Sequence, residues 1–166
     1  MARTQVFTHM APRDIPLFAA YVLTPEGQDY QAWEFDVLVG DPEEPGSHYP
    51  ASARRQALYL NSLKIDAVGW FYDTPKLIEC KPVAGCGAIG QVLVYQKWYQ
   101  LIFDRTPSML IVCRQMTRQI QIMCDIMGIG YKCLYPADDY TITKAISYVK
   151  PLIRKRSILP LFQAVS

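Results

Sequence analysis

The segment from residue 65 to residue 81 reads IDAVGWFY-DTP-KLIECK, two apolar runs joined by three turn-forming residues. Runs rich in β-branched and aromatic residues on either side of such a turn are typical of a β-hairpin. Each run carries one acidic residue, Asp66 in the first and Glu79 in the second. An unpaired buried carboxylate is costly to desolvate, so both side chains are expected to be paired, hydrogen-bonded or bound to a cation.

Glu79 and Lys81 lie two residues apart, and side chains at that spacing project from the same face of a strand. Cys80 between them points to the other face. This pair suits metal-assisted hydrolysis, because the carboxylate binds a hard cation such as Mg2+ or Mn2+ and the lysine positions or helps deprotonate the attacking water. Asp66 is a second carboxylate ligand if the hairpin register turns it toward Glu79, and the sequence leaves that register open.

These residues resemble the PD-(D/E)XK nuclease superfamily, in particular its RecB-like branch. Its pattern is an Asp on one strand, Glu-X-Lys on the next and Gln-X-X-X-Tyr on the following helix, matched here by Asp66, Glu79-Cys80-Lys81, Gln91 and Tyr95. The resemblance covers about residues 51–136. It implies that Asp66, Glu79 and the backbone carbonyl of Cys80 bind Mg2+ or Mn2+. It also implies that Lys81 serves the attacking water and that Gln91 and Tyr95 flank the site or the substrate.

One feature of the family pattern is missing where we expect it. Many members add an acidic residue from an upstream helix, but the helix predicted at residues 51–62 contains none. The acids considered before that helix are Glu34, Asp36, Glu43 and Glu44, and the sequence assigns none of them to the site.

The order of the predicted elements gives an α/β fold with a mixed central sheet flanked by helices. The resemblance implies the same arrangement, a restriction-endonuclease-like core. We predict a strand at 32–39, helices at 51–62, 88–103, 117–127 and 141–149, and strands at 64–72, 76–81, 109–114 and 131–135. We expect one domain in three parts: an N-terminal extension packed on the core (1–50), the nuclease-like core (51–136), and a C-terminal helix with a basic tail (137–166).

Cysteine spacing and hydropathy argue against a disulfide-rich protein, a structural metal site and a membrane protein. The five cysteines show no Cys-X-X-Cys spacing, so we expect reduced thiols rather than a disulfide framework or a structural metal. No apolar run reaches the ~20 residues of a membrane span, and the N-terminus lacks the apolar segment of a signal peptide. We therefore expect no membrane partner and a cytoplasmic location, with a virion as the alternative.

The net charge of +2 does not by itself indicate a nucleic-acid-binding protein. Basic residues do gather near the C-terminus, and four of them are candidates for binding phosphates: Lys150, Arg154, Lys155 and Arg156. The alternative is that these side chains simply belong to a solvated tail.

The function predicted from these observations is a metal-dependent DNA nuclease that hydrolyses phosphodiester bonds. The alternative is a catalytically inactive protein of the same fold that has a structural or DNA-binding role. Such a protein would work in a homo-oligomer or larger assembly, for example as a phage head-to-tail (neck) component.

Overall fold

The computed structural model describes residues 6–7, 10–43 and 45–154. In chain order its elements are α1 (Ile15–Val22), α2 (Pro25–Gln28), β1 (Ala32–Val39), α3 (Ala51–Asn61), β2 (Leu63–Phe71), β3 (Thr74–Ala84), α4 (Cys86–Phe103), β4 (Ser108–Met116), α5 (Arg118–Met127), β5 (Ile129–Cys133), α6 (Asp139–Val149) and a 3-10 turn, η2 (Lys150–Leu152).

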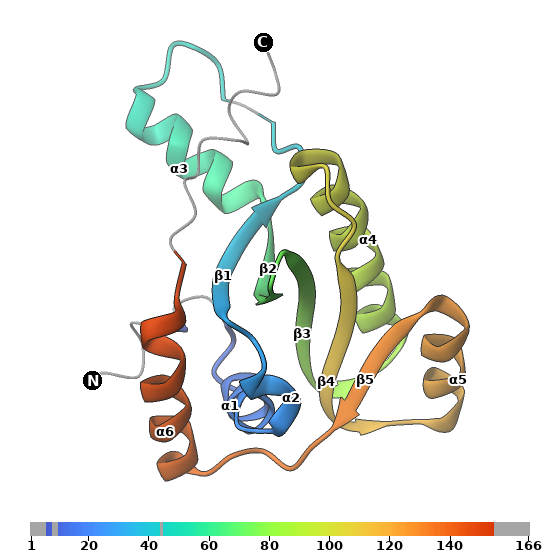
Figure 1. Ribbon diagram of the computed structural model, residues 1–166. Coiled ribbons are helices and arrows are strands. Elements are labelled where there is room, and N and C mark those ends of the chain that lie inside the picture. Colours follow the sequence, from blue (N-terminus) through green and yellow to red (C-terminus); the bar gives the residue numbers. More distant parts are fainter. Residues whose placement is uncertain (1–5, 8–9, 44, 155–166) are drawn as a thin grey trace.

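The strands form one five-stranded sheet in the order β1-β2-β3-β4-β5 (Figure 1). β1, β2 and β3 are antiparallel neighbours, whereas β4 lies parallel to β3 and β5 lies parallel to β4. Parallel neighbours need a crossover connection, and α4 and α5 supply it. The predicted α/β class, a mixed sheet flanked by helices, is confirmed.

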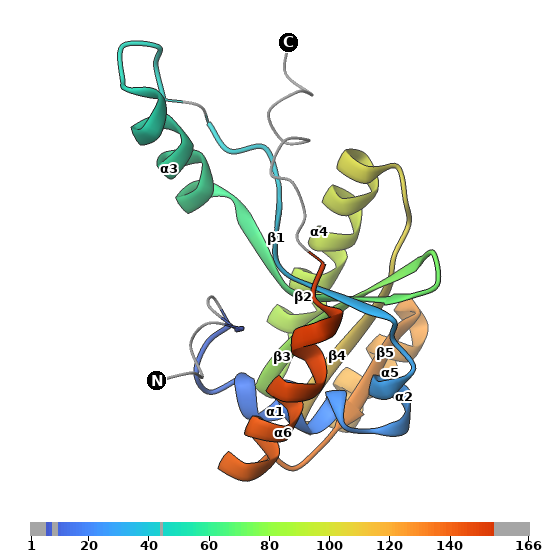
Figure 2. The ribbon, with the colours of Figure 1, turned by 60° about the vertical axis from the view of Figure 1, so that its left-hand side comes forward.

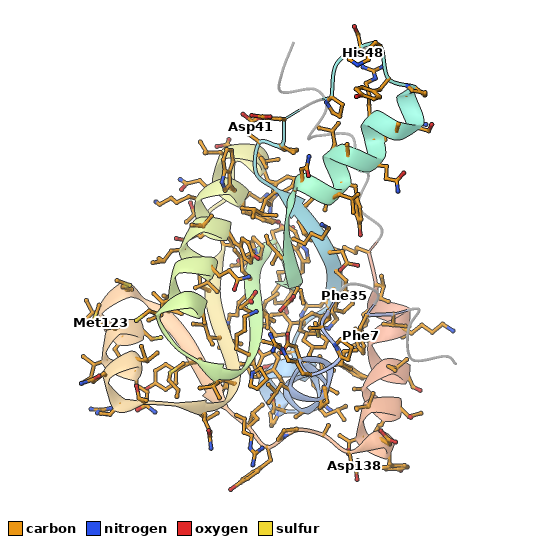
Figure 3. The ribbon with its side chains drawn as sticks, turned by 180° about the vertical axis from the view of Figure 1, so that it is seen from behind. Phe7, Phe35, Asp41, His48, Met123 and Asp138 are labelled. Carbon is orange, nitrogen blue, oxygen red and sulfur yellow. The ribbon has the colours of Figure 1, made fainter. Side chains whose placement is uncertain are left out.

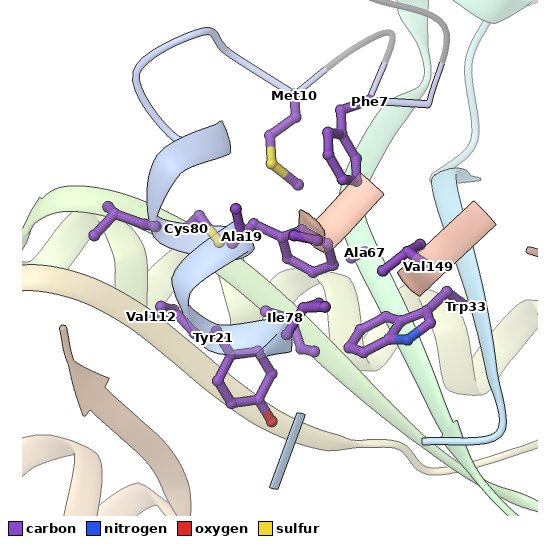
Figure 4. Close-up of a cluster of buried hydrophobic side chains, with 14 of the residues drawn as sticks. Phe7, Met10, Ala19, Tyr21, Trp33, Ala67, Ile78, Cys80, Val112 and Val149 are labelled. Carbon is purple, nitrogen blue, oxygen red and sulfur yellow. The ribbon is translucent and has the colours of Figure 1, made fainter. Parts of the chain in front are cut away.

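Alternation of side chains along β3 builds a core on each face of the sheet. Ile78 and Cys80 pack with residues of α1 and α6 on one face, and Leu77 packs with Tyr95 and Tyr99 of α4 on the other. Figure 4 shows the first of these clusters, in which Ile78, Cys80 and Val112 of the sheet meet Ala19 and Tyr21 of α1. Glu79 shares the α4 face with Leu77 and is nevertheless buried.

The antiparallel pairing of β1, β2 and β3 is interrupted near Asp36 and Asp66. β1 and β2 pair from Ala32↔Trp70 to Val39↔Leu63, but the pair Asp36↔Asp66 is missing from the ladder and Asp36 has a left-handed backbone, φ 54°. β2 pairs with β3 only as far as Ala67↔Ile78. The first residues of β2 and the last of β1 therefore leave the main sheet, and α3, which joins them, projects from the rest of the molecule (Figure 2).

Two parts of the chain have a different place from the one the sequence suggested. Residues 32–39, grouped above with an N-terminal extension, form β1 within the central sheet. α3, placed above at the start of the core, buries only Leu58. Figure 3 shows Asp41 and His48 at the same end of the molecule as α3, far from Met123 and Asp138.

The element boundaries differ from the predicted ones by a few residues. β3 is longer than predicted, and β5 begins at Ile129, directly after Gly128 ends α5 with a left-handed φ of 67°. Gly130, the next glycine, lies within β5. Among the described helices, none is both long and apolar enough to span a bilayer.

Candidate metal centre and active site

Asp66 and Glu79 come directly after the last paired residues of the β2–β3 ladder, Ala67 and Ile78. Ala67 and Ile78 lie in the core on the α1 side of the sheet, so alternation of side chains directs both carboxylates to the other side. The ladder ends here, and the Asp66 carboxylate takes over its role by accepting a hydrogen bond from the Cys80 backbone N–H at 3.2 Å.

Glu79 and Lys81 form an ion pair on this face, with 2.7 Å between Oε1 and Nζ. Glu79 is 1% exposed, and its Oε2 has no hydrogen-bond partner among the described residues. Burial and the neighbouring charge of Asp66 raise the pKa of Glu79 to about 7, although Lys81 opposes the shift. Burial alone would lower the pKa of Lys81, but the hydrogen bond and charge of Glu79 outweigh it and raise that pKa instead.

The pKa of Asp66 is also set by burial and nearby groups that act in opposite directions. Burial raises its pKa to about 6, against the opposing effects of the Cys80 N–H and the Lys81 ammonium. Both carboxyl groups therefore titrate near neutrality, and the charge of Asp66 disfavours ionisation of Glu79. An added cation would relieve both penalties at once.

Asp14 is a third acid near this centre, and the sequence analysis missed it. It is 2% exposed, and its charge raises the pKa of both Asp66 and Glu79. Burial raises the pKa of Asp14 itself, while Lys81 acts to lower it. Its Oδ1 has no hydrogen-bond partner in the described part of the chain, and Arg13 Nε lies 3.8 Å away.

Asp14 occupies the N-cap position of α1, yet its side chain makes no capping hydrogen bond. Aspartate before Ile-Pro is a recognisable helix-start signal, so the sequence did contain a cue to an acid at the beginning of an upstream helix. The family pattern led us to expect that acid on the 51–62 helix, but α3 projects from the sheet while α1 packs against β3 and β4.

Gln91 and Tyr95 lie one helical turn apart on α4, and Gln91 Nε2 donates a hydrogen bond to the Tyr95 hydroxyl at 2.8 Å. Tyr95 is 5% exposed. Burial raises its pKa, and the charges of Glu79 and Asp66 add to the shift, so the phenol lies within electrostatic range of both carboxylates. The structure thus brings together Asp66, Glu79, Lys81, Gln91 and Tyr95.

The residues at this centre fit Mg2+ or Mn2+. Mg2+ is commonly held by one or two carboxylates together with water molecules, and Asp66 and Glu79 supply two. Throughout residues 6–7, 10–43 and 45–154, no group of three or more His, Cys, Asp or Glu side chains has a metal-holding arrangement. The role of the Cys80 backbone carbonyl as a further ligand stays a prediction.

Of the four basic C-terminal candidates, the structure describes Lys150 and Arg154. Lys150 is an exposed residue of η2, and the Arg154 guanidinium lies 5.4 Å from the centroid of the Trp70 ring. Trp70 is four positions along β2 from Asp66, roughly 13 Å at the rise of a strand. Lys155 and Arg156 lie outside the described residues.

Comparisons with known proteins give one weak structural likeness. No family model matches the sequence, and no curated protein matches it. A crystal structure of a repair endonuclease from Pyrococcus abyssi aligns with a TM-score of 0.40 and 14% sequence identity. The alignment covers 61% of this chain and 39% of that chain, so this chain spans well under half the length of that endonuclease.

Proposed function

We infer that the protein is a metal-dependent deoxyribonuclease that hydrolyses phosphodiester bonds. The observation that carries this proposal is the point where β2 and β3 separate, which holds Asp66 and Glu79 on one face with the Lys81 ammonium 2.7 Å from Glu79. Two partly neutralised carboxylates beside a cationic donor suit a reaction that needs a bound cation and an oriented water. The family resemblance at the same residues favours DNA as the substrate.

The chain's own residues have separate tasks in this proposal. Asp66 and Glu79 hold Mg2+ or Mn2+, which supplies Lewis-acid chemistry at a phosphate oxygen. Lys81 has a raised pKa and stays protonated at neutral pH, so it orients the water or stabilises charge on the phosphate. The Gln91–Tyr95 pair supports the neighbouring wall of the site from α4.

The test is cleavage of supercoiled and linear DNA by the purified full chain with Mn2+ or Mg2+. Activity should require the metal and be removed by EDTA. Glu79→Gln should remove it too, because the amide keeps the size of the side chain but lacks the charge. Asp125→Asn, an exposed acid on α5, is the matched control and should cut like the unsubstituted chain. Activity that persists unchanged in Glu79→Gln would contradict the proposal, and a mock purification from cells without the protein controls for a contaminating nuclease.

The 2.7 Å Glu79–Lys81 ion pair also favours the second candidate, an inactive protein of this fold. The pair neutralises the buried Glu79 charge without any cation, so the cluster is electrostatically tolerable as a purely structural feature. No cleavage with any divalent metal, together with a defined oligomer by light scattering, would favour an architectural role. A phage head-to-tail component is one example of such a role.

A further inference from the structure

Two cysteines face each other across the parallel strands at the edge of the sheet. Cys113 of β4 and Cys133 of β5 are register partners, and their sulfur atoms lie 3.6 Å apart. Cys113 is fully buried, whereas Cys133 is exposed. Both are free thiols, so one reduced pair combines an accessible sulfur with a protected one.

We propose that Cys113 and Cys133 are an oxidation site that closes to a reversible intramolecular disulfide on exposure to a low-molecular-weight disulfide. Sulfur atoms 3.6 Å apart must approach by about 1.5 Å to form a bond of about 2.05 Å, a movement within reach of side-chain rotation and small strand shifts. Neighbouring strands also hold the two Cα atoms at about 4.8 Å, inside the range that disulfides bridge.

The exposure of the two thiols fixes the order of the steps. The Cys133 thiolate attacks one sulfur of the small disulfide, forming a mixed disulfide and releasing one small thiolate. The Cys113 thiolate then attacks the Cys133 sulfur, forming the internal disulfide and releasing the second small thiolate. Two protein thiols are oxidised and one small disulfide is reduced to two thiols, so electrons and atoms balance.

Cys113 is suited to the second step rather than the first. Burial and its interaction with Cys133 raise the pKa of Cys113 to about 12, which keeps it protonated and inert toward reagents in solution. In the mixed disulfide the Cys133 sulfur already lies beside Cys113. A small ionised fraction of the Cys113 thiol is therefore sufficient for the attack.

The disulfide would join the two neighbouring parallel strands β4 and β5 covalently. Once formed, the bond closes the β4–α5–β5 unit into a covalent loop and restrains α5.

The test uses full-length protein carrying Cys86→Ser, which removes the other exposed cysteine and leaves four thiols (five less Cys86). After incubation with oxidised glutathione, thiols alkylated under denaturing conditions should fall from four to two and return with dithiothreitol. Non-reducing peptide mapping should find Cys113 joined to Cys133. Adding Cys113→Ser should leave a glutathionyl group on Cys133 and no internal disulfide.

Three results would overturn the proposal. One is a stable glutathionyl group on Cys133 while Cys113 is present. Another is a disulfide from Cys113 to Cys124, the buried thiol of α5. The third is a Cys133-linked dimer as the main product on a non-reducing gel. Peptide mapping of the unsubstituted chain gives the same decision without relying on any variant folding correctly.

Discussion

At the scale of single residues, the acids of the candidate site are in an environment that disfavours their charge. Glu79 has a pKa of about 7 and Asp66 of about 6, well above the ordinary values of 4.5 and 3.8. Near neutral pH these groups compete for protons as well as for any cation. Proton binding, metal binding and stability are therefore linked at the same atoms.

Metal affinity should therefore depend on pH. A cation at Asp66 and Glu79 must displace protons, so the apparent affinity for Mn2+ should rise steeply between about pH 5.5 and 7.5. Calorimetric titrations in buffers of different ionisation enthalpy measure both the affinity and the protons released. Constant affinity across this range, with no proton release, would argue against these carboxylates as ligands.

The stability of the metal-free protein should fall as pH rises, whereas its metal affinity should increase. A carboxyl group whose pKa is higher in the folded than in the unfolded chain stabilises the fold below the unfolded pKa, and that contribution is lost as pH rises through the folded value. The melting temperature of the metal-free protein should fall from pH 5 to pH 8. The fall should be smaller in Glu79→Gln, and an identical fall in both proteins would contradict the pKa assigned to Glu79.

Lys81 should matter for rate far more than for metal binding. Lys81→Ala removes the donor beside the water and should reduce cleavage by about 10²–10⁴-fold while Mn2+ still binds. Lys97→Ala, an exposed lysine on α4, is the control and should cut normally. A Lys81→Ala protein with wild-type rates would remove Lys81 from the mechanism.

At the scale of elements, the separation of β2 from β3 creates the site. Asp66 lies where the ladder stops, so its carboxylate replaces a strand partner and turns toward the other acids. Asp14, the N-cap residue of α1, is close enough for its charge to raise the pKa of Asp66 and Glu79. The side chain that would normally cap this helix is available to the site because it makes no capping bond.

Two N-cap aspartates provide a matched comparison. Asp138 caps α6 by accepting a hydrogen bond from the Thr141 N–H at 2.8 Å, whereas Asp14 caps nothing. Asp138→Ala should lower the free energy of unfolding, because the helix loses its N-cap, and leave Mn2+ affinity unchanged. Asp14→Asn should weaken Mn2+ binding, with little loss of helix stability. Chemical unfolding measures the stability of each variant, and calorimetry measures its Mn2+ affinity. If Asp138→Ala weakened Mn2+ binding and Asp14→Asn did not, Asp14 would be excluded from the site.

At the scale of the whole molecule, the sequence predicted what depends on local pattern. Apolar alternation and turn residues located the hairpin, and the family resemblance pointed to Gln91 and Tyr95. The sequence did not predict features that depend on contacts between residues far apart in the chain. The register that sets Asp66 against Glu79, the projection of α3 and the reach of Asp14 all depend on where β1 and β2 leave the sheet. Arg154 was chosen for its charge, but its packing over Trp70 depends on the tertiary fold.

The central claim is that the acids on β2 and β3 make a hydrolytic metal site. The most direct test is the ratio of the Mn2+-dependent DNA cleavage rates of the unsubstituted chain and Glu79→Gln, with both proteins shown to be folded by circular dichroism. We predict a ratio of at least about 10², as expected when a group essential to transition-state stabilisation is lost. Equal, measurable rates in the two proteins, or no cleavage by either, would contradict the account.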